Sequence, residues 1–172
     1  SKGHAGAALY ATLSEFEYFP STLLKTHYQN GSNLSGHVSH KGIPGVEVST
    51  GSLGHGLPIA VGMALSAKLK NQKHKIYVLL SDGELDEGSN WESFLFASHH
   101  GLDNLTAIVD YNKLQSLDTV ENTLNLEPLD QKFISFGWNV IKGSGHDFFQ
   151  INDSFQQAYR SQKPSIIIAD TI

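Results

Sequence analysis

The sequence contains no cysteine, so disulfides, thiolate metal sites and cysteine nucleophiles are all excluded. It also lacks an excess of basic residues: the formal net charge is -5, and no run is rich in Lys and Arg. A general affinity for nucleic acid or for an anionic membrane is therefore not expected. Any anionic ligand must be held by a few local groups.

Long apolar runs are missing as well. Runs such as 165–169 are too short to cross a bilayer, and the first residues show no charged, apolar and cleavable signal pattern. We expect no membrane association and a location in the cytoplasm. The composition, with 40% hydrophobic and 17% charged residues, is typical of a folded globular chain. At 172 residues, we expect a single domain over 1–172.

Short apolar runs alternate with helical patterns along the chain. Buried strands are predicted at 76–80, 105–109, 138–141 and 165–169. Helices are predicted at 5–16, 57–70, 91–100 and 130–136. This alternation predicts an α/β fold with a mainly parallel sheet. The segments 30–56 and 113–128 lack periodicity and are predicted to be long loops, which in compact domains are usually functional or disordered.

An acidic loop directly follows the first predicted strand, in the stretch IYVLLSDGELDEGSNWE. Ligands of open parallel sheets bind at such carboxyl ends of strands. Asp82 can ligate a hard cation there, and Gly83 lets a phosphate oxygen approach the main-chain amide closely. Taken alone, the segment fits a turn with a helix cap better, because Ser, Asp and Gly are favoured in both.

The next predicted strand, in LTAIVDYNKLQ, leads to Asn112. In a parallel sheet this side chain reaches the same edge as Asp82. Mg2+ requires octahedral oxygen ligation and usually combines one or two protein groups with phosphate oxygens and water. The pair therefore predicts a Mg2+ site for a diphosphate, completed by a main-chain carbonyl, although Asn112 in isolation would be an ordinary turn residue.

Four segments occur in an order that resembles the transketolases, enzymes that use thiamine diphosphate (ThDP). They are SKGHA at 1–5, SGH at 35–37, PGVEVSTGSLGHG at 44–56 and DGELDEGSNWE at 82–92. The resemblance continues through KPSIIIADTI at 163–172 and covers essentially the whole chain. It implies a three-layer α/β/α ThDP-binding fold, in a domain that the family extends at both ends and that would be truncated here.

The resemblance also implies a cofactor site, residue by residue. The implied metal ligands are Asp82, Asn112 and, through its main-chain carbonyl, Leu114. The implied ThDP-binding residues are His4, Gly51, Ser52, Leu53, Gly83 and Asn112. The segment 51–53 matches the part of the family that packs beside the cofactor rings, and its plain alternative is a glycine-rich turn before a helix.

His4 and His37 match family histidines that face the reactive carbon of the cofactor and the hydroxyls of the substrate. They are the catalytic residues that the resemblance implies, because an imidazole exchanges protons or donates hydrogen bonds near neutral pH. His40 and His55 lie in the same predicted loops and receive no proton-transfer role. Surface or packing positions are expected for the other histidines: His27, His74, His99, His100 and His146.

The activity that the resemblance implies is transfer of a two-carbon ketol unit from a ketose, often a sugar phosphate, to an aldose. In the family, a glutamate from a separate pyrimidine-binding domain activates the cofactor, which lies between domains of two subunits. We therefore expect this chain to need a C-terminal transketolase subunit or domain, in a homo- or hetero-oligomer. Alone, it is expected to be inactive.

One residue departs from the family pattern, since Ser81 stands where glycine usually precedes the metal-binding aspartate. The backbone conformation that the family adopts just before this aspartate is therefore not assumed for residue 81. Three other functions remain open: another ThDP enzyme, such as a 2-oxo acid dehydrogenase subunit or a deoxyxylulose-phosphate synthase, a noncatalytic cofactor-binding module, and an unrelated Mg2+-dependent phosphate enzyme. The segments SKGHA and STGSLGHG favour transketolase.

Overall fold

The computed structural model describes residues 1–172 and contains two compact units, Ser1–Leu53 and Gly54–Ile172. Each unit has apolar clusters of its own. The expectation of a single domain over these residues stays a prediction.

The first unit is helical and irregular. It contains the 3-10 turn η1 (Gly3–Ala5), helix α1 (Gly6–Glu15) and the 3-10 segment η2 (Ser21–Thr26). The predicted helix at 5–16 is thus confirmed to within one residue at each end. The remainder of the unit has no regular element, as predicted for its long loop. Its core consists of Tyr10, Leu13, Phe19, Leu34, Val38 and Ile43.

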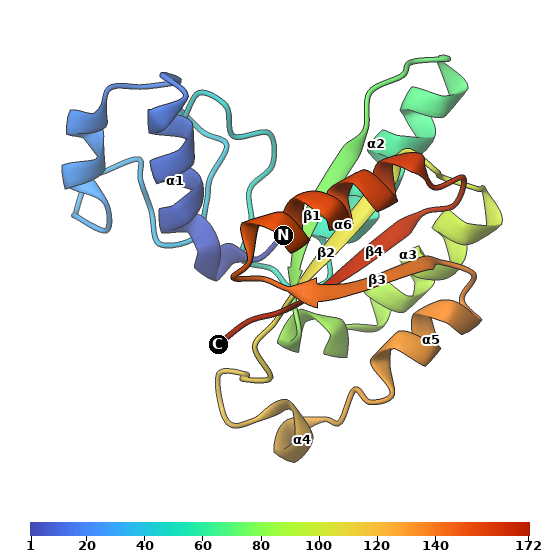
Figure 1. The fold of residues 1–172 in the computed structure, drawn as a ribbon. Helices are drawn as coiled ribbons and strands as arrows, with labels where there is room; N and C mark the ends of the chain where they lie inside the picture. Colours follow the sequence, from blue (N-terminus) through green and yellow to red (C-terminus); the bar gives the residue numbers. More distant parts are fainter. The chain divides into compact units, whose positions relative to one another are not determined.

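The second unit is built on a four-stranded sheet (Figure 1). Its strands are β1 (Ile76–Ser81), β2 (Leu105–Tyr111), β3 (Asn139–Ser144) and β4 (Ser165–Asp170). Their order in the sheet is β1-β2-β4-β3, and every neighbouring pair is parallel. All four predicted strands are confirmed, and each runs further toward its carboxyl end than the apolar run alone predicts.

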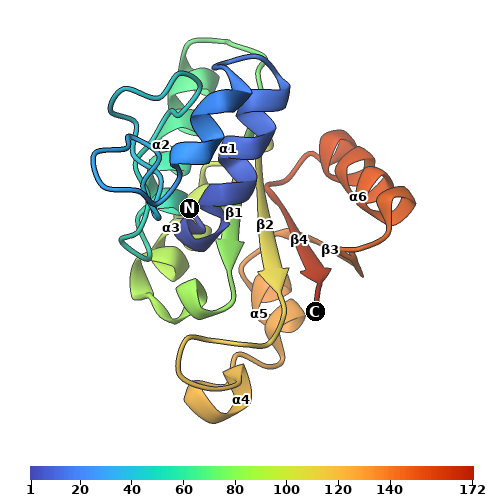
Figure 2. The same ribbon diagram turned by 90° about the vertical axis from the view of Figure 1, so that its left-hand side faces the viewer.

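Helices cover both faces of this sheet. They are α2 (Gly56–Leu69), α3 (Gly88–His99), α4 (Val120–Thr123), α5 (Leu129–Ser135) and α6 (Phe148–Arg160). Along β4, Ile166 and Ile168 pack in the cluster that contains α2, α3 and α5, whereas Ile167 between them packs with α6. Successive side chains of a strand point to opposite faces, so α6 lies on the other face from α3 and α5, as Figures 1 and 2 show. The predicted α/β/α layering is confirmed.

Helix α6 is not among the helices that the sequence pattern predicts. Its first turn is capped by Asp147, whose carboxylate accepts the N–H groups of Phe149 and Gln150. Its fully buried positions, Ser154 and Ala158, are small. Among its large apolar side chains, Phe155 packs partly buried against Ile141 and Ile167, whereas Phe148 and Phe149 at its start are exposed.

The predicted loop at 113–128 contains little regular structure. Besides the short α4, it has one antiparallel bridge, between Leu114 and Thr119. The longest helix of the chain is α2, with 14 residues, and no helix combines the length and apolar character that crossing a bilayer requires.

Candidate functional site

The two residues on which the metal prediction depends follow neighbouring strands. In the register of β1 with β2, Ser81 is the partner of Asp110. Asp82 comes directly after β1 and Asn112 directly after β2, at the same edge of the sheet. Adjacent strands lie roughly 4.8 Å apart. The structure therefore presents an oxygen donor from each strand end at one edge, while a shared ion stays a prediction.

Asp82 begins the 3-10 turn η3 (Gly83–Asp86) and is almost completely buried, with 2% of its surface exposed. Its Oδ1 accepts the N–H of Gly83 at 2.8 Å. This is the amide that the resemblance assigns to the diphosphate, so a phosphate oxygen would share this N–H with the carboxylate or replace it. A carboxylate buried at a turn is held by such hydrogen bonds because burial of a charge is otherwise costly.

Gly83 also marks a close approach between two loops. A Cβ added at this position would lie 3.3 Å from Cγ of Gln115, in the loop after β2. The loop that carries Asp82 and the loop that carries Asn112 therefore meet at Gly83. A residue with a side chain at this position would crowd the side chain of Gln115 and fill part of the space beside the Gly83 amide.

The loop after Asn112 is held in a defined shape. Oδ1 of Asn112 accepts the N–H of Leu114 at 3.0 Å, and Lys113 between them has a positive φ of 63°. The main-chain oxygens of Lys113 and Asp118 accept hydrogen bonds from Val120 and Gln115. No hydrogen bond reaches the Leu114 carbonyl. That carbonyl and the second lone pair of the Asn112 oxygen are therefore available as metal ligands.

Ser81 has a structural role in the same turn. Its Oγ accepts the N–H of Glu84 at 3.2 Å, which satisfies one main-chain donor at the start of η3. The turn is also tied to α3, because Nε1 of Trp91 donates to the Leu85 oxygen at 2.8 Å. The departure from the family's glycine thus adds a hydrogen bond to the loop.

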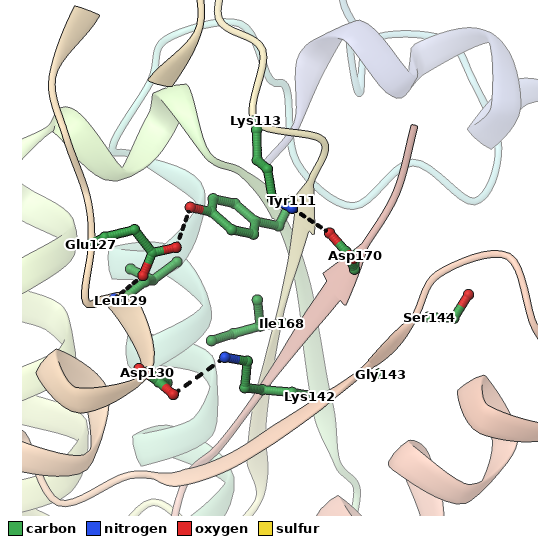
Figure 3. A pocket seen from close by; sticks show the side chains of 10 residues that line it. All are labelled: Tyr111, Lys113, Glu127, Leu129, Asp130, Lys142, Gly143, Ser144, Ile168 and Asp170. Carbon is green, nitrogen blue, oxygen red and sulfur yellow. Dashed lines mark hydrogen bonds and ion pairs between the residues drawn. The ribbon is translucent and has the colours of Figure 1, made fainter. Parts of the chain in front are cut away.

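A pocket of about 380 Å3 lies at this edge, and Tyr111 and Lys113, the sequence neighbours of Asn112, are among the residues that line it. Figure 3 shows that its charged groups meet in pairs. Lys142 pairs with Asp130 at 3.2 Å, and Lys113 pairs with Asp170 at 3.1 Å. This pocket was not predicted from the sequence, because its partners come from four separate segments and no motif connects them.

Hydrogen bonding fixes the protonation of Tyr111 and Glu127, which both line the pocket. The Tyr111 hydroxyl donates to Oε1 of Glu127, and Oε2 of Glu127 accepts the N–H of Leu129 at 2.9 Å. The Leu129 amide, followed by the Tyr111 hydroxyl, lowers the pKa of Glu127. Burial, followed by the neighbouring Glu127, raises the pKa of Tyr111. Around neutral pH the pair is therefore a phenol donating to a carboxylate.

In the first unit, the structure brings together site residues from three different motifs. The ring centroids of His4 and His37 are 5.2 Å apart, and both side chains are exposed. Gly51 packs against the same imidazole: a Cβ there would lie 3.3 Å from Cβ of His37, and its φ of +118° is one that favours glycine. Ser52 and Leu53 follow directly and are exposed.

A second glycine makes room for the same histidine. A Cβ on Gly3 would lie well under 3.0 Å from Cδ2 of His37, which is closer than real contacts of this kind. The G of SKGHA is therefore required by the imidazole ring of the SGH motif. His40 is held differently, with Nδ1 at 2.6 Å from Oγ of Ser49, and the structure gives it no connection to the His4 and His37 pair.

The comparisons with known proteins agree with these motifs. The family model for "Transketolase, thiamine diphosphate binding domain" matches residues 1–172. The chain is 46% identical to one of the subunits of the apulose-4-phosphate transketolase of Actinobacillus succinogenes, over 99% of this chain and 62% of that protein. It is 44% identical to the 6-deoxy-6-sulfo-D-fructose transketolase subunit SqwG of a Clostridium species, over 100% of this chain and 63% of that protein.

A solved structure shows the same fold. The chain superposes on the transketolase of Campylobacter jejuni with a TM-score of 0.94 at 38% identity, over 99% of this chain and 28% of that one. The 172 residues thus span about three fifths of the two curated subunits and a smaller part of the solved enzyme. Over its whole length, the chain belongs to the transketolase family and represents the family's thiamine diphosphate binding domain.

Proposed function

We propose that the chain provides the diphosphate-binding half of the cofactor site in a transketolase-type enzyme. The complete enzyme transfers a two-carbon ketol unit from a ketose, often phosphorylated, to an aldose. The observation that carries this proposal is the placement of Asp82 and Asn112 after neighbouring parallel strands. Family members are transferases, and the names of the two subunit relatives designate transketolases of unusual sugars.

The donor set of this edge fits Mg2+ and a diphosphate. Asp82 offers a carboxylate, Asn112 an amide oxygen and Leu114 a carbonyl that accepts no hydrogen bond. Three oxygen donors leave positions for phosphate oxygens and water, as Mg2+ requires. Only one of the three carries a formal charge, so the anionic diphosphate adds favourable charge to the metal. The Gly83 amide would bind a phosphate oxygen.

The chemistry at carbon comes from the cofactor, whose thiazolium acts as an electron sink when it is bound. The chain's own contribution to proton movement is assigned to His4 and His37. Both imidazoles are exposed and adjacent, so they can exchange protons with, or donate hydrogen bonds to, the hydroxyl groups of a sugar. Gly51, Ser52 and Leu53 are assigned to the rings of the cofactor.

A partner is part of this proposal. The glutamate that activates the cofactor is assigned to a C-terminal transketolase subunit or domain, in a homo- or hetero-oligomer. Both curated relatives are named as subunits rather than as whole enzymes, which supports an arrangement of two different chains. Sugars or sugar phosphates are the proposed substrates, and location in the cytoplasm stays a prediction from the sequence.

Calorimetric titration tests the proposal. ThDP is titrated, with and without Mg2+, into the chain combined with a pyrimidine-domain subunit. We expect affinity that depends on Mg2+ and falls at least about a hundredfold, or roughly 2.7 kcal/mol, in Asp82→Ala. Asp153→Ala removes an exposed carboxylate of α6 and serves as the matched control.

Two results would decide against the function. Metal-independent ThDP binding that Asp82→Ala leaves unchanged would contradict the assigned site. A complex that binds ThDP with Mg2+ but transfers no ketol unit between any sugar pair would indicate a noncatalytic cofactor-binding module instead.

A further inference from the structure

Glu84 is a completely buried carboxylate two residues after the proposed metal ligand, with 0% of its surface exposed. The sequence groups it with Asp86 and Glu87 as one acidic loop, in which a solvated side chain is the ordinary expectation. Burying a carboxylate is costly unless hydrogen bonds hold it. The hydrogen bonds of the Glu84 carboxylate therefore show which segments it holds together.

The carboxylate connects η3 to the residue that leads into α2. Oε1 of Glu84 accepts the N–H of Gly54 at 3.2 Å. The carbonyl of the same Gly54 accepts the Ser89 hydroxyl, from α3, at 2.7 Å. Both main-chain groups of Gly54 are thus held, the N–H by η3 through Glu84 and the carbonyl by α3 through Ser89.

Gly54 is suited to this position in two ways. Its φ of +74° favours glycine, and an added Cβ would lie 2.8 Å from Cβ of Glu87 and closer still to Oγ of Ser89. The peptide therefore packs directly on the start of α3. A side chain at position 54 would push Gly54 away from Ser89, which donates to its carbonyl.

The main chain of Glu84 is fixed as well. Its N–H donates to Oγ of Ser81, and its carbonyl accepts Nδ2 of Asn90 at 2.5 Å. The side chain and both main-chain groups of one residue therefore join the end of β1, the start of α3 and the peptide before α2. Asp82 and Gly83 lie in the sequence between Ser81 and Glu84, which are joined by one of these hydrogen bonds.

We propose that Glu84 is a positioning residue for the diphosphate and Mg2+ site: by joining η3 to Gly54, it holds the Asp82–Gly83 peptide ready before the ligand arrives. This inference rests on the proposed function. Its physical basis is preorganisation, because a loop that is already ordered loses less conformational freedom on binding.

Two substitutions of similar size separate positioning from mere stability. Glu84→Gln keeps an oxygen that accepts the Gly54 N–H, whereas Glu84→Leu removes it. ThDP affinity at saturating Mg2+ is measured for the chain with its pyrimidine-domain partner, together with hydrogen exchange of residues 81–87 before ThDP is added. We expect Glu84→Leu to weaken ThDP at least about tenfold, or roughly 1.4 kcal/mol, and to speed this exchange. Glu84→Gln should restore both values to within about threefold of wild type, or roughly 0.7 kcal/mol.

Ser89→Ala keeps the inference testable if Glu84→Leu does not fold. It removes the hydroxyl that donates to the Gly54 carbonyl and leaves Glu84 intact. We expect it to weaken ThDP by about three- to tenfold. Folded Glu84→Leu with wild-type affinity and exchange, or wild-type affinity in Ser89→Ala when Glu84→Leu is unfolded, would overturn the inference.

The two proposals fail in different ways. If wild-type protein binds ThDP without Mg2+ dependence and Asp82→Ala has no effect, the proposed function is wrong. If binding depends on Mg2+ and on Asp82 but is indifferent to Glu84 and Ser89, only the positioning role is wrong.

Discussion

The hydroxyl of Tyr111 donates a 2.7 Å hydrogen bond to Oε1 of Glu127, joining the end of β2 to the segment before α5. Figure 3 shows this bond between Tyr111 and Glu127. Tyr111 directly precedes Asn112, so the bond fixes the strand end that leads into the proposed metal ligand. The two side chains belong to the same edge as the site but to none of the four motif segments. Their contribution can be measured apart from catalysis.

Tyr111→Phe removes this hydrogen bond and keeps the aromatic ring. We expect the free energy of unfolding to fall by about 1 kcal/mol, since Glu127 keeps its bond to the Leu129 amide. Urea denaturation measures the difference. Tyr159→Phe, at an exposed position of α6, is the control and should change stability little. Equal stability of both variants would mean that the Tyr111 bond contributes nothing net.

The same pair predicts how stability depends on pH. The pKa of Glu127 is lowered from 4.5, so its contribution is complete above pH 4.5 and is lost as the pH falls through the lower folded pKa. The pKa of Tyr111 is raised from 10.0, so its contribution is complete below pH 10.0 and is lost as the pH rises through the higher folded pKa. Unfolding free energy should therefore decline outside this window.

Urea denaturation across a pH series checks both limbs. Glu127→Gln should reduce the loss of unfolding free energy at acid pH. Part of this loss should remain, because the pKa values of Asp130 and Asp147 are also lowered. Tyr111→Phe should flatten the alkaline limb. An acid limb identical in wild type and Glu127→Gln would contradict the assignment of Glu127.

Gly3→Ala tests the packing of the two histidine motifs. The new Cβ would overlap Cδ2 of His37, with the Gly51 main chain at 3.3 Å behind it. We expect the imidazole of His37 to be displaced and ketol transfer by the complex to be reduced. The free energy of unfolding should fall by about 1–3 kcal/mol, as it does for other overpacked sites. Thermal denaturation and an activity assay of the complex measure the two effects.

Gly62→Ala is the matched control for this change. Nothing lies within 4 Å of a Cβ at Gly62, in the middle of α2. Replacing a helical glycine by alanine there should stabilise the protein by about 0.4–1 kcal/mol. If Gly3→Ala behaves like Gly62→Ala, the close packing of Gly3 against His37 is not a constraint in solution.

The proposed proton-transfer roles predict a specific kinetic pattern. His4→Ala and His37→Ala should each lower kcat for ketol transfer by about 10²–10⁴-fold, the usual contribution of a general acid or base. ThDP affinity should change far less in His37→Ala, because His37 is not assigned to cofactor binding, than in His4→Ala, whose residue the resemblance also assigns to ThDP. Stopped-time assays with calorimetry separate the two quantities, with His74→Ala at an exposed position as the control. Wild-type kcat in both variants would remove these histidines from the mechanism.

Much of the second unit could be predicted from sequence because its strands are continuous apolar runs. Strands buried on both faces, such as the one at 166–168, give this signal without alternation. Their carboxyl ends were harder to place, since Tyr111 and Asp170 extend the ladders beyond the apolar part. Helix α6 was not predicted, although Phe155 and Ala158 lie on its buried face, because the exposed Phe148 and Phe149 at its start obscure the helical spacing.

Asp82 and Gly83 could be proposed as site residues only together with Asn112 and the ordered motifs, because the segment alone also fits a turn, and their roles stay predictions. The sequence gives no such signal where packing decides the role of a residue. Nothing in DGELDE distinguishes the buried Glu84 from its exposed neighbour Glu87. The sequence likewise does not show what the Ser81 hydroxyl contacts. Only the structure shows that it accepts a hydrogen bond from the Glu84 N–H.

The strand order β1-β2-β4-β3 has a consequence for how the protein is made. β3 is paired only with β4, which is the last strand of these 172 residues to leave the ribosome. During translation, β1 and β2 can join as soon as both are synthesised, but β3 has to wait for a neighbour. Burial of Ile166 to Ile168 between β2 and β3 is therefore late among these residues, and the apolar side chains of β3 lack their neighbouring strand until β4 has been synthesised.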